Sequence, residues 1–302
     1  MLNWPEEGAA ANGAVEQWSS PGSNRMLDFH GDPQASNLVV LSDGNHHMAL
    51  EPSLRAFRDR FPEVEEIFYA TTPPRPILDL LRKGRIKIGN FILSAKPHLF
   101  LAPPHVLDGL VADGHMTSHR PFMKNRGSVL LVRKGNPKRI NGAGDLARKD
   151  VRLFLSNPHT ETVSYRGYVA TLKALAIREG CDVSFLEATS SNAKICFGNS
   201  IHHREAPEAV AAGIVDAAVV YYHLALRYVR IFPAHFDMVR LNGGVDATDP
   251  DPGNVIGVTH AGLIGDGGPW GKRCLDFLCS RQVADIYAEH GLDPADPQAF
   301  AD

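Results

Sequence analysis

Three short apolar runs within residues 37–112 are each followed by a polar loop and then by a segment with apolar residues at helical spacing. The runs are 37–41, 66–69 and 98–101. A strand, a loop and a helix repeated with short connections predict an α/β fold with a mostly parallel sheet flanked by helices. Ligands of such sheets collect at the loops after the carboxyl ends of the strands. In this chain those loops are 42–47, 70–74 and 102–104.

A second series of apolar runs, from Gly127 to about residue 241, is separated by similar polar loops. With 302 residues the chain is too long for one small core and fits two medium-sized lobes. We expect lobe 1 at 37–122, completed by about 243–302, and lobe 2 at 123–242.

Three further segments have less regular patterns. Residues 1–36 are rich in Gly, Ala, Ser, Asn and Pro without helical or strand period, which predicts a loosely ordered N-terminal arm. Segment 117–125 is predicted as a crossover between the lobes and 183–186 as a strand. Segment 270–290 has apolar residues at helical spacing and is predicted as one closing helix that ends at Gly291.

The stretch 201–221 combines a polar loop, a short helix and a buried strand. Pro207 suits the first turn of the helix, where a missing N–H costs nothing. Gly213 can end that helix in a left-handed cap. Ala217–Val220 is a continuous apolar run, typical of a strand covered on both faces.

His203, Arg204 and Glu205 are therefore expected where a loop enters a helix. Free backbone N–H groups and the helix dipole favour an anion at such a position. The guanidinium fork of Arg204 suits an oxyanion, and an ion pair with Glu205 or Glu208 is its structural alternative.

Composition excludes several classes of protein. The chain is 44% hydrophobic and 22% charged, as in ordinary globular proteins, and its net charge of −3 argues against a nucleic-acid partner. No run is long enough to span a membrane, and the first seven residues lack the features of a signal peptide. The sequence as written is therefore expected in the cytoplasm. No Ser-His-Asp, Cys-His or H-E-x-x-H spacing occurs, so we expect no enzyme.

Four local patterns are similar to those of one protein family. They are Phe100-Leu101-Ala102 before a helix and the run 127–133; Leu155–Thr162 followed by Tyr168 and Leu172; a helix, then Gly213-x-x-Asp216-Ala217-x-x-x-Tyr221; and Asp276-Phe277-Leu278 before 287–291. In this order, over about residues 37–293, they resemble the type II periplasmic solute-binding proteins, most closely the molybdate/tungstate-binding branch. Two loops that are Ser-rich in molybdate binders read Asp43–His47 and Ala70–Pro74 here, which indicates a divergent subgroup.

The resemblance implies a two-lobed receptor with a ligand cleft between the lobes. It implies capture of a small oxyanion, such as molybdate or tungstate, by hinge closure, with no catalysis and no cofactor. The implied partner is an ABC transporter permease if the protein is exported, and the implied compartment is the periplasm or cell envelope. We expect a monomer.

The candidate residues offer neutral donors and a few charges. The oxyanion hypothesis selects Asn45, Thr71, Thr72, Asn157, Thr160, Thr162, His203, Arg204 and Tyr221. Asn45 also suits a turn, the Thr residues suit helix caps, and Tyr221 suits a core. An alternative hypothesis is a divalent transition metal or metal chelate held by His46, His47, Glu161, His203 and Glu205. A second alternative is a cytosolic ligand sensor with the same fold.

Overall fold

The computed structural model describes residues 4–5, 15–16, 28–88, 90–186, 194–199, 201–241 and 250–300. The chain divides into two compact units. The outer unit consists of Arg25–Lys124 and Val258–Asp302, and the central unit of Asn125–Gly257 together with Met1–Asn24. In the described part of the chain, no helix combines the length and apolar character needed to cross a membrane.

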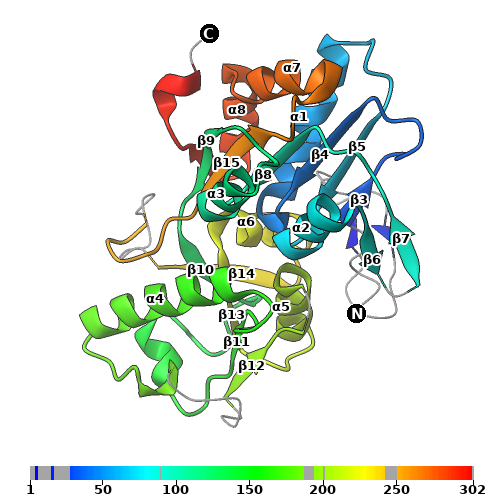
Figure 1. Ribbon diagram of the computed structural model, residues 1–302. Helices are drawn as coiled ribbons and strands as arrows, with labels where there is room; N and C mark the ends of the chain where they lie inside the picture. Colours follow the sequence, from blue (N-terminus) through cyan, green and yellow to red (C-terminus); the bar gives the residue numbers. More distant parts are fainter. Residues whose placement is uncertain are drawn as a thin grey trace. The chain divides into compact units, whose positions relative to one another are not determined.

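The outer unit contains a seven-stranded sheet of order β16-β9-β15-β8-β4-β5-β3 (Figure 1). β4, β5 and β8 are parallel, while β15 is antiparallel to β8 and β9, and β3 to β5. The strands are β3 (Phe29–His30), β4 (Leu38–Ser42), β5 (Ile67–Thr71), β8 (Leu99–Ala102), β9 (His119–Asn125), β15 (Val258–Leu263) and β16 (Leu292–Pro294).

Helices cover this sheet, and the strands are buried on both sides as continuous apolar runs should be. Val39, Leu41 and Phe100 point toward a core that includes Ile77 and Leu107 of the following helices. The helices are α1 (His47–Arg60), α2 (Pro74–Lys83), α3 (Pro104–Ala112), α7 (Gly268–Leu278) and α8 (Arg281–Glu289). A separate hairpin of β6 (Ile86–Ile88) and β7 (Phe91–Leu93) follows α2.

The central unit contains a five-stranded sheet of order β12-β11-β13-β10-β14. β11 is parallel to β12 and β13, and β10 is antiparallel to β13 and β14. The strands are β10 (Ser128–Arg133), β11 (Leu153–Leu155), β12 (Ile195–Phe197), β13 (Ala217–Tyr221) and β14 (Phe236–Arg240). Its helices are α4 (Thr162–Arg178), α5 (His202–Ala211) and α6 (Tyr222–Ile231).

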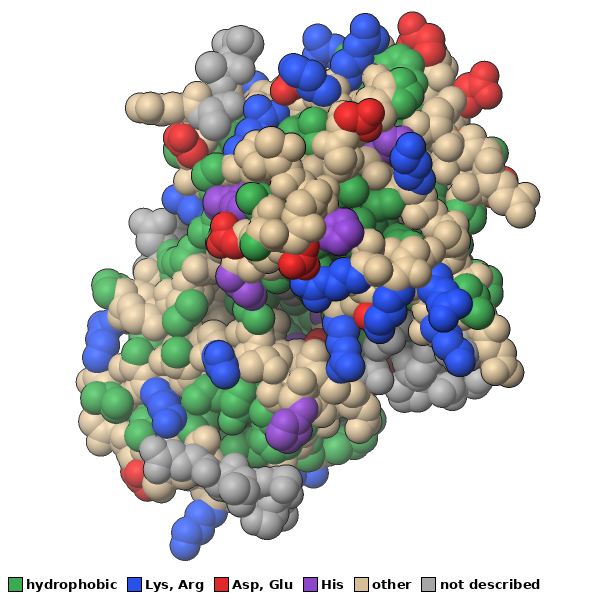
Figure 2. Space-filling view, in the orientation of Figure 1, with side chains coloured by type: hydrophobic (Ala, Val, Ile, Leu, Met, Phe, Trp, Pro, Cys, Tyr) green, Lys and Arg blue, Asp and Glu red, His purple; other side chains and the backbone are tan. Residues whose placement is uncertain are grey.

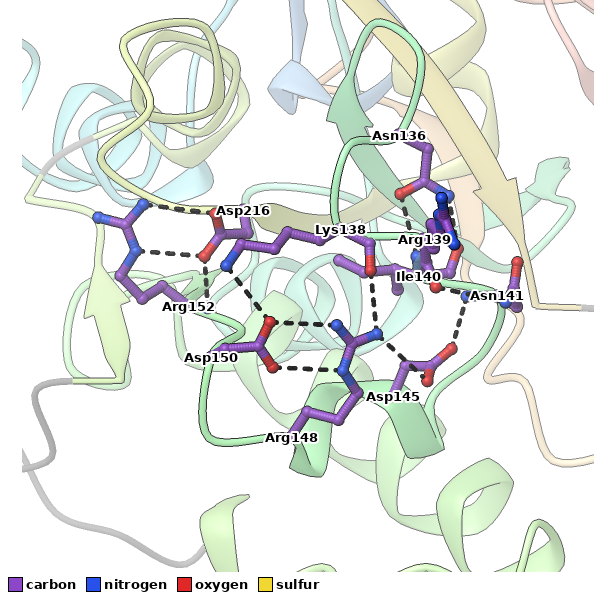
Figure 3. A network of polar contacts seen from close by, with 10 residues as sticks. All are labelled: Asn136, Lys138, Arg139, Ile140, Asn141, Asp145, Arg148, Asp150, Arg152 and Asp216. Carbon is purple, nitrogen blue, oxygen red and sulfur yellow. Dashed lines mark hydrogen bonds and ion pairs between the residues drawn. The ribbon is translucent and has the colours of Figure 1, made fainter.

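A network of charges fixes the loop between β10 and β11 (Figure 3). The Arg152 side chain and backbone N–H donate to the Asp216 carboxylate, which is 2% exposed, with Arg152 N at 2.9 Å. Lys138 and Arg148 both reach Asp150. The exposed pairs contribute little to stability, whereas the buried Asp216 ties the start of β11 to the start of β13.

Several predicted elements differ from the structure. Both sheets are mixed rather than mostly parallel. The predicted strand at 183–186 is a 3₁₀ turn at Ser184–Leu186, and the closing helix breaks into α7 and α8 at Cys279 and Ser280. The four cysteines, all within described residues, are free thiols.

Segment 117–125 is not a simple crossover, because most of it forms β9. Pro121 disfavours a strand in the sequence, but it lies opposite His260, beside an irregularity in the β15 register. Bulges are among the few strand positions that accept proline.

Two predicted boundaries also move. Phe29–His30 pairs with β5, so the sheet takes in part of the segment predicted as a loose arm; most of the residues before Asp28 lie outside the described part. The chain returns to the outer unit at Val258 rather than near residue 243. Asn254 contributes to this boundary, because its side chain accepts a hydrogen bond from Ser128 N (2.7 Å) and donates one to Ser128 O (2.9 Å).

Candidate functional site

One edge of the central sheet collects hydroxyl groups. Ser128 at the start of β10 is paired with Tyr221 at the end of the antiparallel β13. Ser156 directly follows β11, which is parallel to β13, so it lies at the same edge. The Oγ atoms of Ser128 and Ser156 are buried and make no hydrogen bond to any residue that the structure describes. Buried polar groups are normally paired, so these two hydroxyls are candidates for hydrogen bonds to a ligand.

Three helices begin at this edge as well. The chain runs from β11 into α4, from β12 into α5 and from β13 into α6. Because β11, β12 and β13 are parallel, all three helices have their N-termini at the carboxyl ends of these strands. The unpaired N–H groups and dipoles of helix N-termini favour an anion.

Tyr221 lies in an aromatic cluster at the same edge. Its ring centroid is 4.9 Å from that of Tyr168, and its ring stacks on His223 with centroids 5.8 Å apart. A Cβ atom at Gly167 of α4 would lie 3.7 Å from the Tyr221 hydroxyl, so that hydroxyl lies near the α4 backbone. Burial raises the pKa of the Tyr168 phenol well above its usual value.

His202, the first residue of α5, joins this cluster. Its ring centroid lies 5.7 Å from that of Phe154 and 5.3 Å from that of Tyr168. It is only 3% exposed, and burial lowers its pKa to about 3, so the imidazole is neutral at physiological pH. Its Nε2 atom makes no hydrogen bond within the described residues.

The structure changes the prediction for His203, Arg204 and Glu205. They lie inside α5, which begins at His202, and Pro207 is within the helix rather than in its first turn. The Glu205 carboxylate accepts hydrogen bonds from the N–H groups of Asn199 and Ile201. It therefore caps the start of the helix, as the acidic residue of a capping box does.

His203 and Arg204 are both buried, at 7% and 3% exposure. Neither is the exposed loop donor that the sequence suggested, although both remain in the first turn of α5, near the hydroxyl edge. Glu161, at the cap of α4, accepts a hydrogen bond from His202 N at 3.1 Å. Its carboxylate thus joins the starts of α4 and α5.

The loop before α4 is held by its own side chains. Asn157 Oδ1 accepts hydrogen bonds from His159 N (2.8 Å) and Thr160 N (3.2 Å), and its Nδ2 donates to Gly198 O (2.8 Å). Thr162 Oγ1 donates to Pro158 O at 3.0 Å, and Thr160 is exposed. These side chains build the loop, and the asparagine and Thr162 use their polar groups within it.

The outer unit has a second set of hydroxyls. Thr71 ends β5 and pairs in register with Ser42 at the end of β4, and Thr72 follows. Both threonines are buried, and their Oγ1 atoms make no hydrogen bond within the described residues. The predicted residues Thr71 and Thr72 therefore carry available hydroxyls. The side chain of Asn45 lies outside what the structure describes.

His46 is a structural residue. Ser42 Oγ donates its only proton to Asp43 O, so it accepts from His46 Nε2, 2.8 Å away. His46 Nδ1 lies 2.8 Å from the Tyr287 hydroxyl, which donates to it in the tautomer that this network assigns. Both ring nitrogens are used, which leaves no lone pair for a metal. His47 Nδ1 donates to Gly44 O at 2.7 Å.

Of the candidate metal ligands, His46 uses both ring nitrogens and His47 one ring nitrogen in these hydrogen bonds. Among the residues that the structure describes, no group of three or more His, Cys, Asp or Glu side chains is arranged to hold a metal ion. Glu161 and Glu205, two of the predicted ligands, each accept backbone N–H groups.

The sequence hypothesis missed Ser128, Ser156 and His202. Ser128 begins one buried apolar run and Ser156 follows another, and only the strand order of the central sheet brings the two together. His202 and His203 are adjacent, and only the register of α5 decides which ring enters the aromatic cluster.

Comparisons with known proteins identify the family of this chain. A family model described as bacterial extracellular solute-binding protein matches residues 92–293. A thiosulfate-binding protein of Escherichia coli (strain K12) is 42% identical over 62 residues, which is 20% of this chain and 18% of that protein. The chain thus matches less than a fifth of the length of that relative.

Solved structures share the fold at low identity. The sulfate-binding protein SubI of Mycobacterium tuberculosis H37Rv matches with a TM-score of 0.63 and 17% identity, over 87% of this chain and 88% of that one. A periplasmic molybdate-binding protein of Azotobacter vinelandii matches with a TM-score of 0.59 and 15% identity, over 86% and 100%. These likenesses confirm the predicted two-lobed α/β fold, and the family match covers about two thirds of the sequence. The chain belongs to the bacterial extracellular solute-binding proteins.

Proposed function

We propose that this solute-binding protein captures a small, fully deprotonated oxyanion of the molybdate or sulfate type and presents it to an ABC transporter, without catalysing a reaction. The observation that carries the proposal is the pair of buried, available hydroxyls of Ser128 and Ser156 at the edge where α4, α5 and α6 begin.

The donors at this edge suit a dianion. Hydroxyls and peptide N–H groups donate hydrogen bonds without a counter-charge, and a hydrogen bond to a charged group contributes roughly 1.5–3 kcal/mol. The nearby carboxylates of Glu161 and Glu205 accept backbone N–H groups. The neutral His202 adds a polar atom rather than a charge.

Several similar proteins are named for ligands of this class, although an iron-bound protein of Pseudomonas aeruginosa shares the fold as well. They include proteins that bind thiosulfate, sulfate and molybdate. Thr71 and Thr72 form the corresponding hydroxyl set of the outer unit, and we propose that they too serve as oxyanion donors.

Titration calorimetry of the dialysed protein with molybdate, tungstate, sulfate, thiosulfate and phosphate tests the proposal. The double variant Ser128→Ala, Ser156→Ala should lose at least about tenfold in affinity for the oxyanion that binds, because two charge-assisted hydrogen bonds disappear. Thr71→Val with Thr72→Val, measured separately, reports on the outer set.

Ser280→Ala is the matched control. Its Oγ is also buried without a hydrogen bond in the described part, but it lies at the start of α8 in the outer unit. It should bind the oxyanion like the wild type. Binding of none of the five anions, or equal affinity in the Ser128→Ala, Ser156→Ala variant, would refute the proposal.

A further inference from the structure

The stretch Leu80–Leu107 is unusual in a chain of net charge −3, because it contains five Lys and Arg residues and no Asp or Glu. It includes the end of α2, the β6–β7 hairpin and the chain that leads into β8. On the face shown in Figure 2, Lys and Arg side chains gather over the region where Figure 1 places α2, β6 and β7.

Two of the five cations already have partners. Arg82 pairs with Asp113 at 2.6 Å and Lys83 with Asp79 at 2.7 Å. Arg85, Lys87 and Lys96 are exposed and make no ion pair with any residue in the described part of the chain. Lys96, just after β7, lies near enough to Asp266 to help lower the pKa of that carboxyl. Arg85 and Lys87 give the start of the hairpin a positive charge that no ion pair offsets in the described part of the chain.

The hairpin also exposes apolar side chains next to these cations. Ile86 and Leu93 are paired in register and pack against the core of the outer unit. Toward the hairpin end, Phe91 is 47% exposed and Ile92 is 56% exposed. Ile92 is paired in register with Lys87, so an apolar and a cationic side chain share one face. The core covers the base of the hairpin and leaves its end uncovered.

We propose that this basic hairpin, consisting of Arg85, Lys87, Phe91, Ile92 and Lys96, docks on the surface of an anionic lipid bilayer. Lys and Arg near such a surface are attracted by its negative potential, and exposed Phe and Ile gain by leaving water at the headgroup boundary. A bilayer needs no shaped partner surface, only a projecting element with both kinds of side chain, and in Figure 1 the hairpin extends beyond the end of α2.

Co-sedimentation of the full chain with lipid vesicles tests the proposal. The protein should pellet with vesicles of phosphatidylcholine and phosphatidylglycerol, remain in solution with phosphatidylcholine alone, and be released by high salt, which screens the charges. Arg85→Glu with Lys87→Glu should lower the bound fraction at least about tenfold, since each cation contributes to the attraction. Phe91→Ser with Ile92→Ser should also weaken binding.

Lys272→Glu with Arg281→Glu is the matched control. Both residues are exposed on α7 and α8 of the same unit, and the substitution changes the net charge by the same amount. This variant should pellet like the wild type, and thermal melting should show that all variants are folded.

Three results would overturn the proposal: no pelleting with the anionic vesicles, equal pelleting with both kinds of vesicle, or wild-type pelleting of the Arg85→Glu, Lys87→Glu variant. Tight binding to soluble polyglutamate with no preference for vesicles would instead identify an acidic protein surface as the partner. None of these results depends on which oxyanion binds.

Discussion

The Tyr228 hydroxyl donates a hydrogen bond to the backbone carbonyl of His203. That carbonyl lies four residues before Pro207, which has no N–H to complete the helical hydrogen bond. The tyrosine of α6 therefore replaces the missing donor of α5. This contact lets a proline lie inside α5 without leaving a buried carbonyl unsatisfied.

Tyr228→Phe should lower the free energy of unfolding by about 1–3 kcal/mol, because a buried acceptor loses its donor. Urea denaturation measures the change. In a Pro207→Ala background, the alanine N–H can donate to His203 O, so the same tyrosine substitution should cost less. Equal losses of unfolding free energy in the two backgrounds would show that the Tyr228 hydroxyl does not replace the N–H that Pro207 lacks.

His202 should make stability depend on pH. Its folded-state pKa, about 3, is below the unfolded value of 6.5, so below pH 6.5 the unfolded chain takes up the proton first. The contribution of the neutral His202 to the free energy of unfolding is complete above pH 6.5 and is lost as pH falls toward 3. Between pH 7 and pH 5 the loss is about 2 kcal/mol.

His202→Gln should therefore show a weaker loss of stability between these two pH values than the wild type, in urea denaturation at each pH. His235→Gln is the control, because His235 is exposed. It should keep the wild-type pH dependence. If His202→Gln and the wild type lose the same free energy, the ring is not held neutral by burial.

The sequence predicts those parts of the fold that depend on local patterns. Three strand-and-helix pairs are recognisable, because each strand is a buried apolar run and each helix has an apolar face. They are β4 with α1, β5 with α2, and β8 with α3. β9 was missed because Pro121 breaks the strand signal, and only its pairing with β15 shows that a register irregularity accommodates it.

The candidate site was less predictable, since it depends on contacts between distant segments. The sequence around Glu205 is the same whether this residue binds a metal or caps a helix. Only the structure shows that its carboxylate accepts hydrogen bonds from the N–H groups of Asn199 and Ile201. Ser128 and Ser156 are brought to one edge only by the strand order of the central sheet. Neither serine has a local feature that separates it from other serines at strand ends.

Asp216 should stabilise the central unit through its charge. Burial raises the pKa of its carboxyl, but the hydrogen bonds and charge of Arg152 outweigh that effect and hold the pKa below its usual value. Asp216→Asn should cost about 1 kcal/mol at neutral pH, because Arg152 is half-exposed and its interaction is partly screened.

The loss of unfolding free energy caused by Asp216→Asn should become smaller as pH falls below 3.8. Below that pH the carboxyl is protonated in the unfolded chain, and the ionised form then stabilises the folded wild type less. Chemical denaturation at several pH values measures this loss. Asp150→Asn, in the exposed part of the same network, should leave stability unchanged. A cost for Asp216→Asn that stays constant down to strongly acidic pH would contradict an ionic origin.

Asn254 should be among the most sensitive positions of the central unit. Its side-chain amide satisfies both the N–H and the C=O of Ser128, and the residue is buried. Asn254→Ala would leave both groups unpaired and should cost about 2–3 kcal/mol in urea denaturation. Asn254→Asp should not restore stability, because a second acceptor would face Ser128 O. Asn141→Ala, at an exposed asparagine whose amide donates to Arg139 O, should cost far less. Equal losses of unfolding free energy at the two asparagines would show that the Asn254 side chain does not hold its segment to Ser128 of β10.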